Sequence, residues 1–341
     1  MNGDPGSEAK LAFLTDPASY PEKPQSVEVR ETHMAWVFLT DTHAYKLKKP
    51  VRFSFLDYTT LDARGCMCAR EVELNRRLAP WVYLGVLTLV RRSDGTLALR
   101  SKSPCETSGF EALDYLVKMR RLPSEGLLDQ AIANEIVSPG RLKEAAELIA
   151  NFYADLPVVG LLQASYASEL VADAELNRSA VRWSLEPGSE PRVERIVHLL
   201  RAFVRKEHAL LEERSKRLVE GHGDLRPEHI YLGPPPAVID CIEFSRSFRI
   251  NDPLDELCFL AMECERLEAR AVGETFVDAY CKAGDEKPPA KLLAFYKARR
   301  ALLRARLSLA HLEENVADPE KWHRRTLHYL AISESYLGDL T

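Results

Sequence analysis

The first third of the chain carries short segments in which apolar and polar residues alternate, separated by turn-forming residues. A period of two places successive side chains on opposite faces of a strand, so this pattern predicts a small antiparallel sheet. One helix is expected over about residues 60–78, because Val72, Leu74 and Leu78 supply apolar positions and Pro80 ends the run. The predicted strands are residues 26–31, 35–40, 43–48, 82–90, 96–100 and 114–119.

Beyond residue 120 the pattern is mainly helical, apart from a non-helical island at residues 221–250. A sheet with one helix followed by a helical region is an α+β arrangement in two lobes. We expect an N-terminal extension (residues 1–25), an N-lobe (26–119) and a C-lobe (120–341). The predicted helices of the C-lobe are residues 127–136, 141–154, 193–218, 253–267, 271–282, 291–312 and 321–337.

Composition narrows the class of protein. The 46 Lys and Arg residues nearly balance 51 Asp and Glu residues, giving a net charge of −5, without the basic excess of a nucleic-acid or membrane-surface protein. The longest apolar run, residues 82–90, is too short to span a bilayer, and the first residues lack the pattern of a signal peptide. The seven cysteines are odd in number and scattered, as expected of reduced packing residues. These features predict a cytoplasmic protein; they leave its oligomeric state open.

The island at residues 221–250 brings potential catalytic groups together. Residues 230–232 and 237–239 read as two short strands around a Gly/Pro turn, which is typical of a hairpin. If Leu232 pairs with Ala237, antiparallel register places His229 opposite Asp240, and Asp224 lies on the loop before the first strand. A lone Gly-Asp or Ile-Asp pair is usually a turn or a cap. This ordered set of groups suits phosphoryl transfer, in which one carboxylate orients a hydroxyl and another holds a metal.

These residues carry a family resemblance. The sequence His-Gly-Asp-Leu-Arg-Pro-Glu-His-Ile at residues 222–230 resembles the catalytic loop of protein-kinase-like enzymes, in the form found in aminoglycoside phosphotransferases and choline kinases. Val-Ile-Asp at residues 238–240 resembles their metal-binding segment. Residues 32–39, 45–51 and 71–77 are similar to uncharacterised bacterial proteins classed as aminoglycoside-phosphotransferase-like. The resemblance spans roughly residues 26–335 and implies a protein-kinase-like two-lobe fold that uses ATP and Mg²⁺, with Mn²⁺ as an alternative.

The resemblance also implies roles for individual residues. Asp224 would be the catalytic base or would align the hydroxyl of a small-molecule acceptor, and Asp240 would bind the metal. Arg226 would stabilise charge on the transferring phosphate; alternatively, it is a surface arginine that pairs with Glu228. His222 is expected to pack beside the loop, and an acidic residue at 255 or 256 to brace it.

Nucleotide binding is expected in the N-lobe. Lys46 would reach the α- and β-phosphates, with Lys48 as the fallback because it lies on the same strand face. Glu71 would orient the lysine; Glu73 is the alternative, but it projects about 200° away around the helix. A solvated run of edge-strand lysines is the competing interpretation. Backbone groups near Val117 and Met119, at the expected hinge, would bind adenine.

Two features depart from the family pattern. The position five residues after Asp224, normally asparagine and a second metal ligand, is His229, and imidazole is a softer ligand that suits zinc or manganese better than magnesium. The turn at residues 31–34 contains no glycine, so phosphate contact must be looser or made by Thr32 and His33. The chain has no GxxxxGK[ST] motif either, which excludes a Walker-type site.

Three functions follow from these observations. The leading one is an ATP-dependent phosphotransferase that acts on a small-molecule hydroxyl. The alternative is a non-catalytic nucleotide-binding pseudokinase that acts through a protein partner, as His229 and the missing glycines would allow. Protein kinase activity fits less well, because Asp-Cys-Ile-Glu at residues 240–243 replaces Asp-Phe-Gly. The basic residues at positions 299, 300, 304 and 306 are candidates for an acceptor site, or form a solvated face that pairs with Glu313 or Glu314.

Overall fold

A computed structural model of the chain describes residues 5–101, 110–160, 166–184, 190–313 and 318–340. Cys105 and Glu314 lie outside these residues. The chain divides into two compact units, one formed by residues 1–127 and 233–246 and the other by residues 128–232 and 247–341. The segment 233–246, which the sequence placed in the C-lobe, therefore clusters with the sheet.

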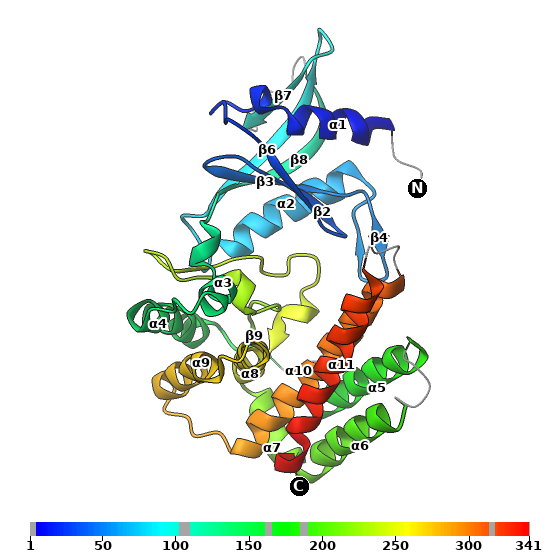
Figure 1. Cartoon of the computed structure of the whole chain (residues 1–341), viewed down its shortest axis with the longest axis vertical. Helices are drawn as coiled ribbons and strands as arrows, with labels where there is room; N and C mark the ends of the chain where they lie inside the picture. Colours follow the sequence, from blue (N-terminus) through cyan, green and yellow to red (C-terminus); the bar gives the residue numbers. More distant parts are fainter. Residues whose placement is uncertain (1–4, 102–109, 161–165, 185–189, 314–317, 341) are drawn as a thin grey trace. The chain divides into compact units, whose positions relative to one another are not determined.

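The first unit is built on one antiparallel sheet of six strands in the order β1-β2-β3-β8-β6-β7 (Figure 1). The strands are β1 (Glu28–Glu31), β2 (Ala35–Leu39), β3 (His43–Lys48), β6 (Tyr83–Arg92), β7 (Leu97–Ser101) and β8 (Phe110–Arg120). A small hairpin, β4 (Arg52–Phe53) and β5 (Leu56–Asp57), follows β3, and β11 (Ala237–Val238) comes from the later segment. All six predicted strands are present; β3 has the predicted ends, and the ends of the others are shifted by a few residues.

Helices lie on both faces of this sheet, as Figure 1 shows for α1 (Pro5–Thr15) and α2 (Leu61–Asn75). The sequence predicted α2 but not α1. Tyr45 and Leu47 of β3 are buried in a cluster with Leu14 from the end of α1. The intervening lysines of β3 face the other way, toward α2. Because helices cover both faces of the sheet, neither face of β3 is open to solvent, and even Lys48 is buried.

Asp114 of β8 forms ion pairs with both helices that pack on the sheet, α1 and α2. Its carboxylate accepts two hydrogen bonds from Arg64 of α2, at 2.8 and 3.0 Å, and one from Lys10 of α1, at 2.9 Å. Asp114 and Arg64 are both buried. A buried carboxylate requires such partners, so the three residues form one fixed ion cluster.

The second unit is mainly helical, which together with the sheet confirms the predicted α+β fold class. Its helices are α3 (Leu128–Ala133), α4 (Pro139–Asp155), α5 (Tyr166–Ser184), α6 (Glu190–Lys206), α7 (His208–Ser215), α8 (Pro253–Arg266), α9 (Arg270–Ala283), α10 (Ala290–Ala310) and α11 (Pro319–Ser335). Its short strands are β9 (Val219–Glu220), β10 (Ile230–Tyr231) and β12 (Ile250–Asn251). The prediction of one helix over residues 193–218 was wrong, because the helix breaks at Glu207. The sequence also missed α5.

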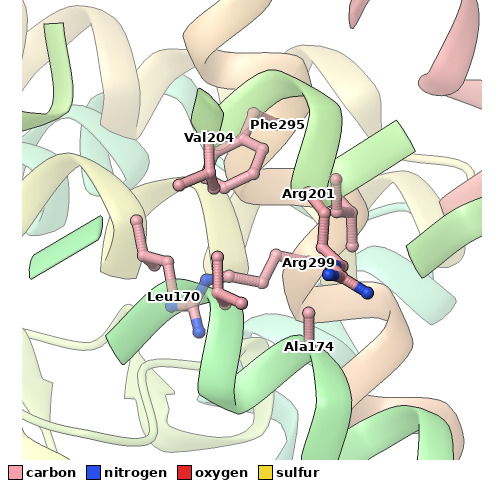
Figure 2. A pocket seen from close by; sticks show the side chains of 8 residues that line it. Leu170, Ala174, Arg201, Val204, Phe295 and Arg299 are labelled. Atoms are coloured by element: carbon pink, nitrogen blue, oxygen red, sulfur yellow. The ribbon is translucent and has the colours of Figure 1, made fainter. Parts of the chain in front are cut away.

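Close packing holds α5, α6 and α10 together. Phe295 of α10 packs near Leu170 and Ala174 of α5 and Val204 of α6, and the hollow between them has no room for a ligand (Figure 2). Among the described residues, no helix is long and apolar enough to cross a membrane. The six described cysteines are free thiols, and the exposed Cys66 is not the packing residue that the sequence predicted.

Candidate functional site

Two lysines project from the same face of β3, as the alternation of that strand predicts. Lys46 pairs in register with Val37 of β2 and Val117 of β8, so it lies in the interior of the sheet and not at an edge. The side chain of Lys46 is 18% exposed and that of Lys48 only 1%. The interpretation of these residues as a solvated edge-strand run is therefore wrong.

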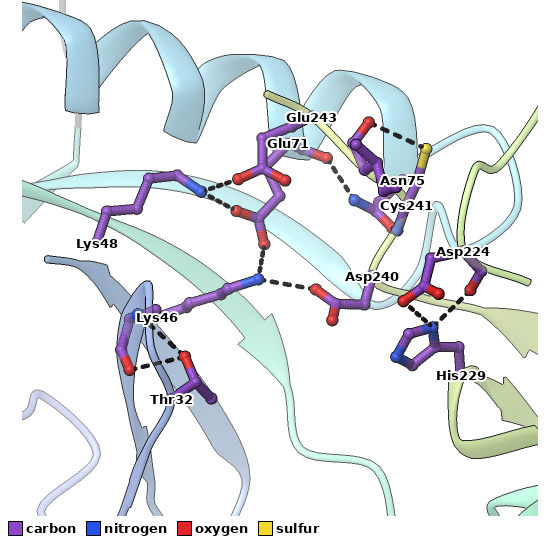
Figure 3. A network of polar contacts seen from close by, with 12 residues as sticks. Thr32, Lys46, Lys48, Glu71, Asn75, Asp224, His229, Asp240, Cys241 and Glu243 are labelled. Atoms are coloured by element: carbon purple, nitrogen blue, oxygen red, sulfur yellow. Dashed lines mark hydrogen bonds and ion pairs between the residues drawn. The ribbon is translucent and has the colours of Figure 1, made fainter. Parts of the chain in front are cut away.

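Both lysines bind the same carboxylate, that of Glu71 on α2 (Figure 3). Lys46 Nζ donates to Glu71 Oε1 at 2.9 Å, and Lys48 Nζ donates to Glu71 Oε2 at 2.6 Å. Glu73, the alternative partner, is 69% exposed and pairs with Arg70. The helix thus directs Glu71 to the lysines and Glu73 to solvent.

Asp240 belongs to the same unit and contacts the same lysine. Lys46 Nζ donates to Asp240 Oδ1 at 2.8 Å, and the Asp240 side chain remains 47% exposed. Its φ is +62°, a left-handed conformation that aspartate tolerates better than most residues. Two hydrogen bonds hold the backbone there: the N–H of Asp240 donates to the Tyr83 hydroxyl at 3.0 Å, and that of Cys241 to Asn75 Oδ1 at 2.9 Å.

Glu243 extends this network, although it was not among the site residues predicted from the sequence. Its Oε1 accepts hydrogen bonds from Lys48 and from the Tyr58 hydroxyl, the latter at 2.8 Å. The sequence did carry a signal for it. Lys48 lies on the same strand face as Lys46, and a second lysine buried there needs a second carboxylate. Burial alone would lower the pKa of Lys46, but Asp240 and Glu71 raise that pKa well above its usual value. Lys46 therefore stays a cation.

In the second unit, Glu256 of α8 holds the His-Gly-Asp loop. Gly223 has a φ of +89°, which glycine adopts without strain and which turns the chain just before Asp224. The Glu256 carboxylate accepts the backbone N–H of His222 at 2.9 Å and also that of Gly223. Of the two expected braces, the structure thus selects Glu256, which is fully buried.

Asp224 lies beside Arg226, whose Nε is 2.9 Å from Asp224 Oδ1. Arg226 also pairs with Glu228, but its side chain is only 16% exposed, so it is not the surface arginine of the alternative interpretation. Burial favours a raised pKa for Asp224, and Arg226 and His229 outweigh it, so that the pKa of Asp224 is lowered. The carboxylate is ionised at neutral pH.

His229 is held by the same loop, at the end of the 3₁₀ turn Pro227–His229. Its Nδ1 is 2.8 Å from the backbone carbonyl of Asp224, so Nδ1 carries the proton that forms this hydrogen bond. Its Nε2 is 3.3 Å from Arg226 Nη2 (Figure 3 shows the Nδ1 contacts). A metal bound by His229 would therefore take Nε2 and displace Arg226 from it. Among the described residues, no group of three or more His, Cys, Asp or Glu side chains is arranged to hold a metal.

The predicted adenine contacts lie inside the sheet. Val117 pairs with Lys46 of β3 and Val86 of β6, and Met119 pairs with Ala44 and Tyr83. Their backbone groups would have to leave these ladders to bind adenine. At the turn between β1 and β2, which has no glycine, the Thr32 hydroxyl accepts the N–H of Ala35 at 3.0 Å.

The basic residues of α10 do not form one solvated face, because Arg299 and Arg300 point into the helical unit. Arg299 and Arg300 are buried and pair with Asp255, and Arg304 donates to the fully buried Glu263 at 2.8 Å. These three arginines neutralise carboxylates inside the helical unit. Arg306, the fourth basic residue, is half-buried, and a role of these residues toward an acceptor stays a prediction. Asp255, the other expected brace, is one of their partners.

Comparisons with known proteins place this arrangement in context. No family model matches the chain. Uncharacterised proteins from Mycobacterium bovis and Mycobacterium tuberculosis are 32% identical over 303 residues, which is 84% of this chain and 56% of theirs. The chain thus spans about half the length of these relatives.

Solved structures of small-molecule kinases align with nearly the whole chain. A choline/ethanolamine kinase family protein from Mesorhizobium loti has a TM-score of 0.55 and 17% identity, with 98% of this chain and 99% of that chain covered. The chain has a protein-kinase-like fold. The GDP and kanamycin complex of an APH(2″) protein has a TM-score of 0.57 and 16% identity, with 95% of this chain and 98% of that chain covered. Choline kinase LicA from Streptococcus pneumoniae has a TM-score of 0.52 and 16% identity, with 95% of this chain and 97% of that chain covered. The resemblance expected from the sequence is confirmed for the fold.

Proposed function

We propose that the protein is an ATP-dependent phosphotransferase that moves the γ-phosphate of ATP to a hydroxyl group of a small molecule. One observation supports this most directly: Lys46 Nζ lies within hydrogen-bond distance of both Glu71 and Asp240. A fixed cation beside an exposed carboxylate suits a nucleotide whose phosphates need a lysine and whose metal needs oxygen ligands. The fold of the small-molecule kinases supports the same reaction class.

Asp240 is the chain's best candidate for holding a divalent metal. Its carboxylate offers the hard oxygen donor that Mg²⁺ and Mn²⁺ prefer, and 47% of the side chain is exposed. His229 is the second candidate, through Nε2, and an imidazole ligand would favour Mn²⁺ over Mg²⁺. When bound, the metal would neutralise charge on the nucleotide phosphates.

Asp224 would align the acceptor hydroxyl and take its proton as the bond to phosphorus forms. The lowered pKa of Asp224 keeps it ionised for this role, and Arg226 is the cause that acts in this direction most strongly. Arg226 itself would place its guanidinium near the transferring phosphate. Glu256 would keep the loop in place, because it bonds two consecutive backbone amides before Asp224.

The test is a screen for acceptor-dependent ADP formation. Purified protein is incubated with ATP, Mg²⁺ or Mn²⁺, and a panel of sugars, amino alcohols, aminoglycosides and nucleosides. Asp224→Asn should abolish turnover, whereas Asp155→Asn, at an exposed position of the same unit, should not change it.

The second candidate, a non-catalytic nucleotide-binding protein, rests on His229 at the position of the expected asparagine. It predicts ATP binding with no ADP above the acceptor-free background for any acceptor. That result would overturn the phosphotransferase, and a protein that binds no nucleotide would overturn both.

A further inference from the structure

Lys48 is the more deeply buried of the two lysines in the first unit's network. Its ammonium donates to Glu71 Oε2 at 2.6 Å and to Glu243 Oε1, and it lies 5.2 Å from the centre of the Tyr58 ring. Only 1% of the side chain is exposed, against 18% for Lys46. A nucleotide that reaches Lys46 therefore does not reach Lys48.

The charges form an alternating chain in the order Glu243, Lys48, Glu71, Lys46, Asp240 (Figure 3). Each oxygen of Glu71 binds a different lysine, so the carboxylate cannot rotate without losing one of them. Glu243 lies three residues after Asp240, and its bond to Lys48 therefore fixes a second point of the segment that carries Asp240. Burying a cation is costly unless it is well paired, so Lys48 needs both partners.

We propose that Lys48 is a positioning residue: with Glu243 it fixes the Glu71 carboxylate and the segment of Asp240, and so holds Lys46 where nucleotide phosphates bind. The inference rests on the proposed function, because it assigns Lys48 a role toward the same nucleotide. It also replaces the expectation that Lys48 touches the phosphates itself.

The test uses the double variant Lys48→Met/Glu243→Gln. This change removes one charge of each sign, so no buried charge is left unpaired and the net charge of the network stays the same. Affinities for Mg²⁺·ADP and for adenosine, which has no phosphates, are measured by calorimetry. Thermal unfolding of each protein is followed in parallel.

We expect the double variant to bind Mg²⁺·ADP about 10- to 100-fold more weakly, the usual effect of removing a group that orients a ligand-binding residue. Its adenosine affinity should stay within about twofold of wild type, since a misplaced Lys46 affects only the phosphates. Adding Lys46→Met to the double variant should weaken the binding of Mg²⁺·ADP only a little further, although the same change alone weakens ADP binding in the wild type.

Equal losses for ADP and adenosine would show a purely structural role and overturn the proposal, as would unchanged ADP affinity. If the double variant does not fold, Glu243→Gln alone decides by the same comparison of ADP with adenosine. A wild-type protein that binds adenosine but neither ADP nor ATP would instead overturn the proposed function.

Discussion

Replacing Glu256 by glutamine tests whether this residue holds the Asp224 loop. When ionised, Glu256 only accepts hydrogen bonds: Oε1 accepts the N–H of Gly223 and the Asn251 amide, and Oε2 accepts the N–H of His222 and the Tyr153 hydroxyl. Glutamine supplies one oxygen and one NH₂, so in either orientation two donors lose their acceptor. The isosteric change thus removes hydrogen bonds without creating a cavity.

The size of the effect follows from those two donors. A buried donor without a partner costs about 1–3 kcal/mol, so Glu256→Gln should lower the free energy of unfolding by about 2–6 kcal/mol. Urea unfolding measures this. Glu144→Gln, at a half-exposed position of α4, serves as the control and should change the stability by no more than about 0.5 kcal/mol. A Glu256→Gln midpoint equal to that of the control would refute the bracing role.

The pH dependence adds a second check. Burial raises the pKa of Glu256 above its usual 4.5, against the smaller opposing effects of its hydrogen bonds and Arg300. A raised pKa means that the folded state binds the proton more readily than the unfolded chain, so the stability from Glu256 is complete below the unfolded pKa and declines as pH rises through the folded one. The advantage of wild type over Glu256→Gln should therefore be largest near pH 4 and smaller at pH 7. An advantage that grows with pH would contradict this sign.

Three further variants probe other parts of the molecule. Asp114→Ala leaves the two cations that it joins unpaired and should cost about 3–5 kcal/mol in urea unfolding; a loss below about 1 kcal/mol would contradict the cluster's role. Arg226→Ala removes the strongest influence that lowers the pKa of Asp224, so the acid limb of kcat/KM should move to higher pH than in wild type. An acid limb at the same pH as in wild type would show that Arg226 does not lower the pKa of Asp224. His229→Asn should raise the ratio of activity with Mg²⁺ to activity with Mn²⁺, and an unchanged ratio would exclude His229 as a metal ligand.

The fold was largely predictable where the periodicity was strong. β3 was predicted with its observed bounds, because Lys46 and Lys48 alternate with Tyr45 and Leu47. Helix α5 was missed although its buried positions recur at helical spacing, since several of them are alanine or polar and give a weak apolar signal. The break between α6 and α7 carries no glycine or proline, so it depends on tertiary packing that the sequence does not reveal.

The site residues were predictable in kind but not in their partners. The motifs identified Asp224, Asp240 and Lys46, because the chemistry requires those residue types in that order. The sequence left Glu71 and Glu73 as alternatives, and only the rotation of α2 against the sheet decides between them. The arginines of α10 were expected at the surface because their partners could not be seen in the sequence. The carboxylates that pair with them come from α5 and α8, far away along the chain.

The central claim is that Lys46, Glu71 and Asp240 form a nucleotide-phosphate site. Calorimetric titration of ATP with Mg²⁺ into wild type and Lys46→Met, with Lys143→Met as an exposed control, tests it most directly. We expect saturable binding by wild type and by the control. The affinity of Lys46→Met should be at least about tenfold weaker, since a lost charged contact usually costs about 1.4 kcal/mol or more. Equal ATP affinity of Lys46→Met and wild type, or no binding by wild type, would contradict it.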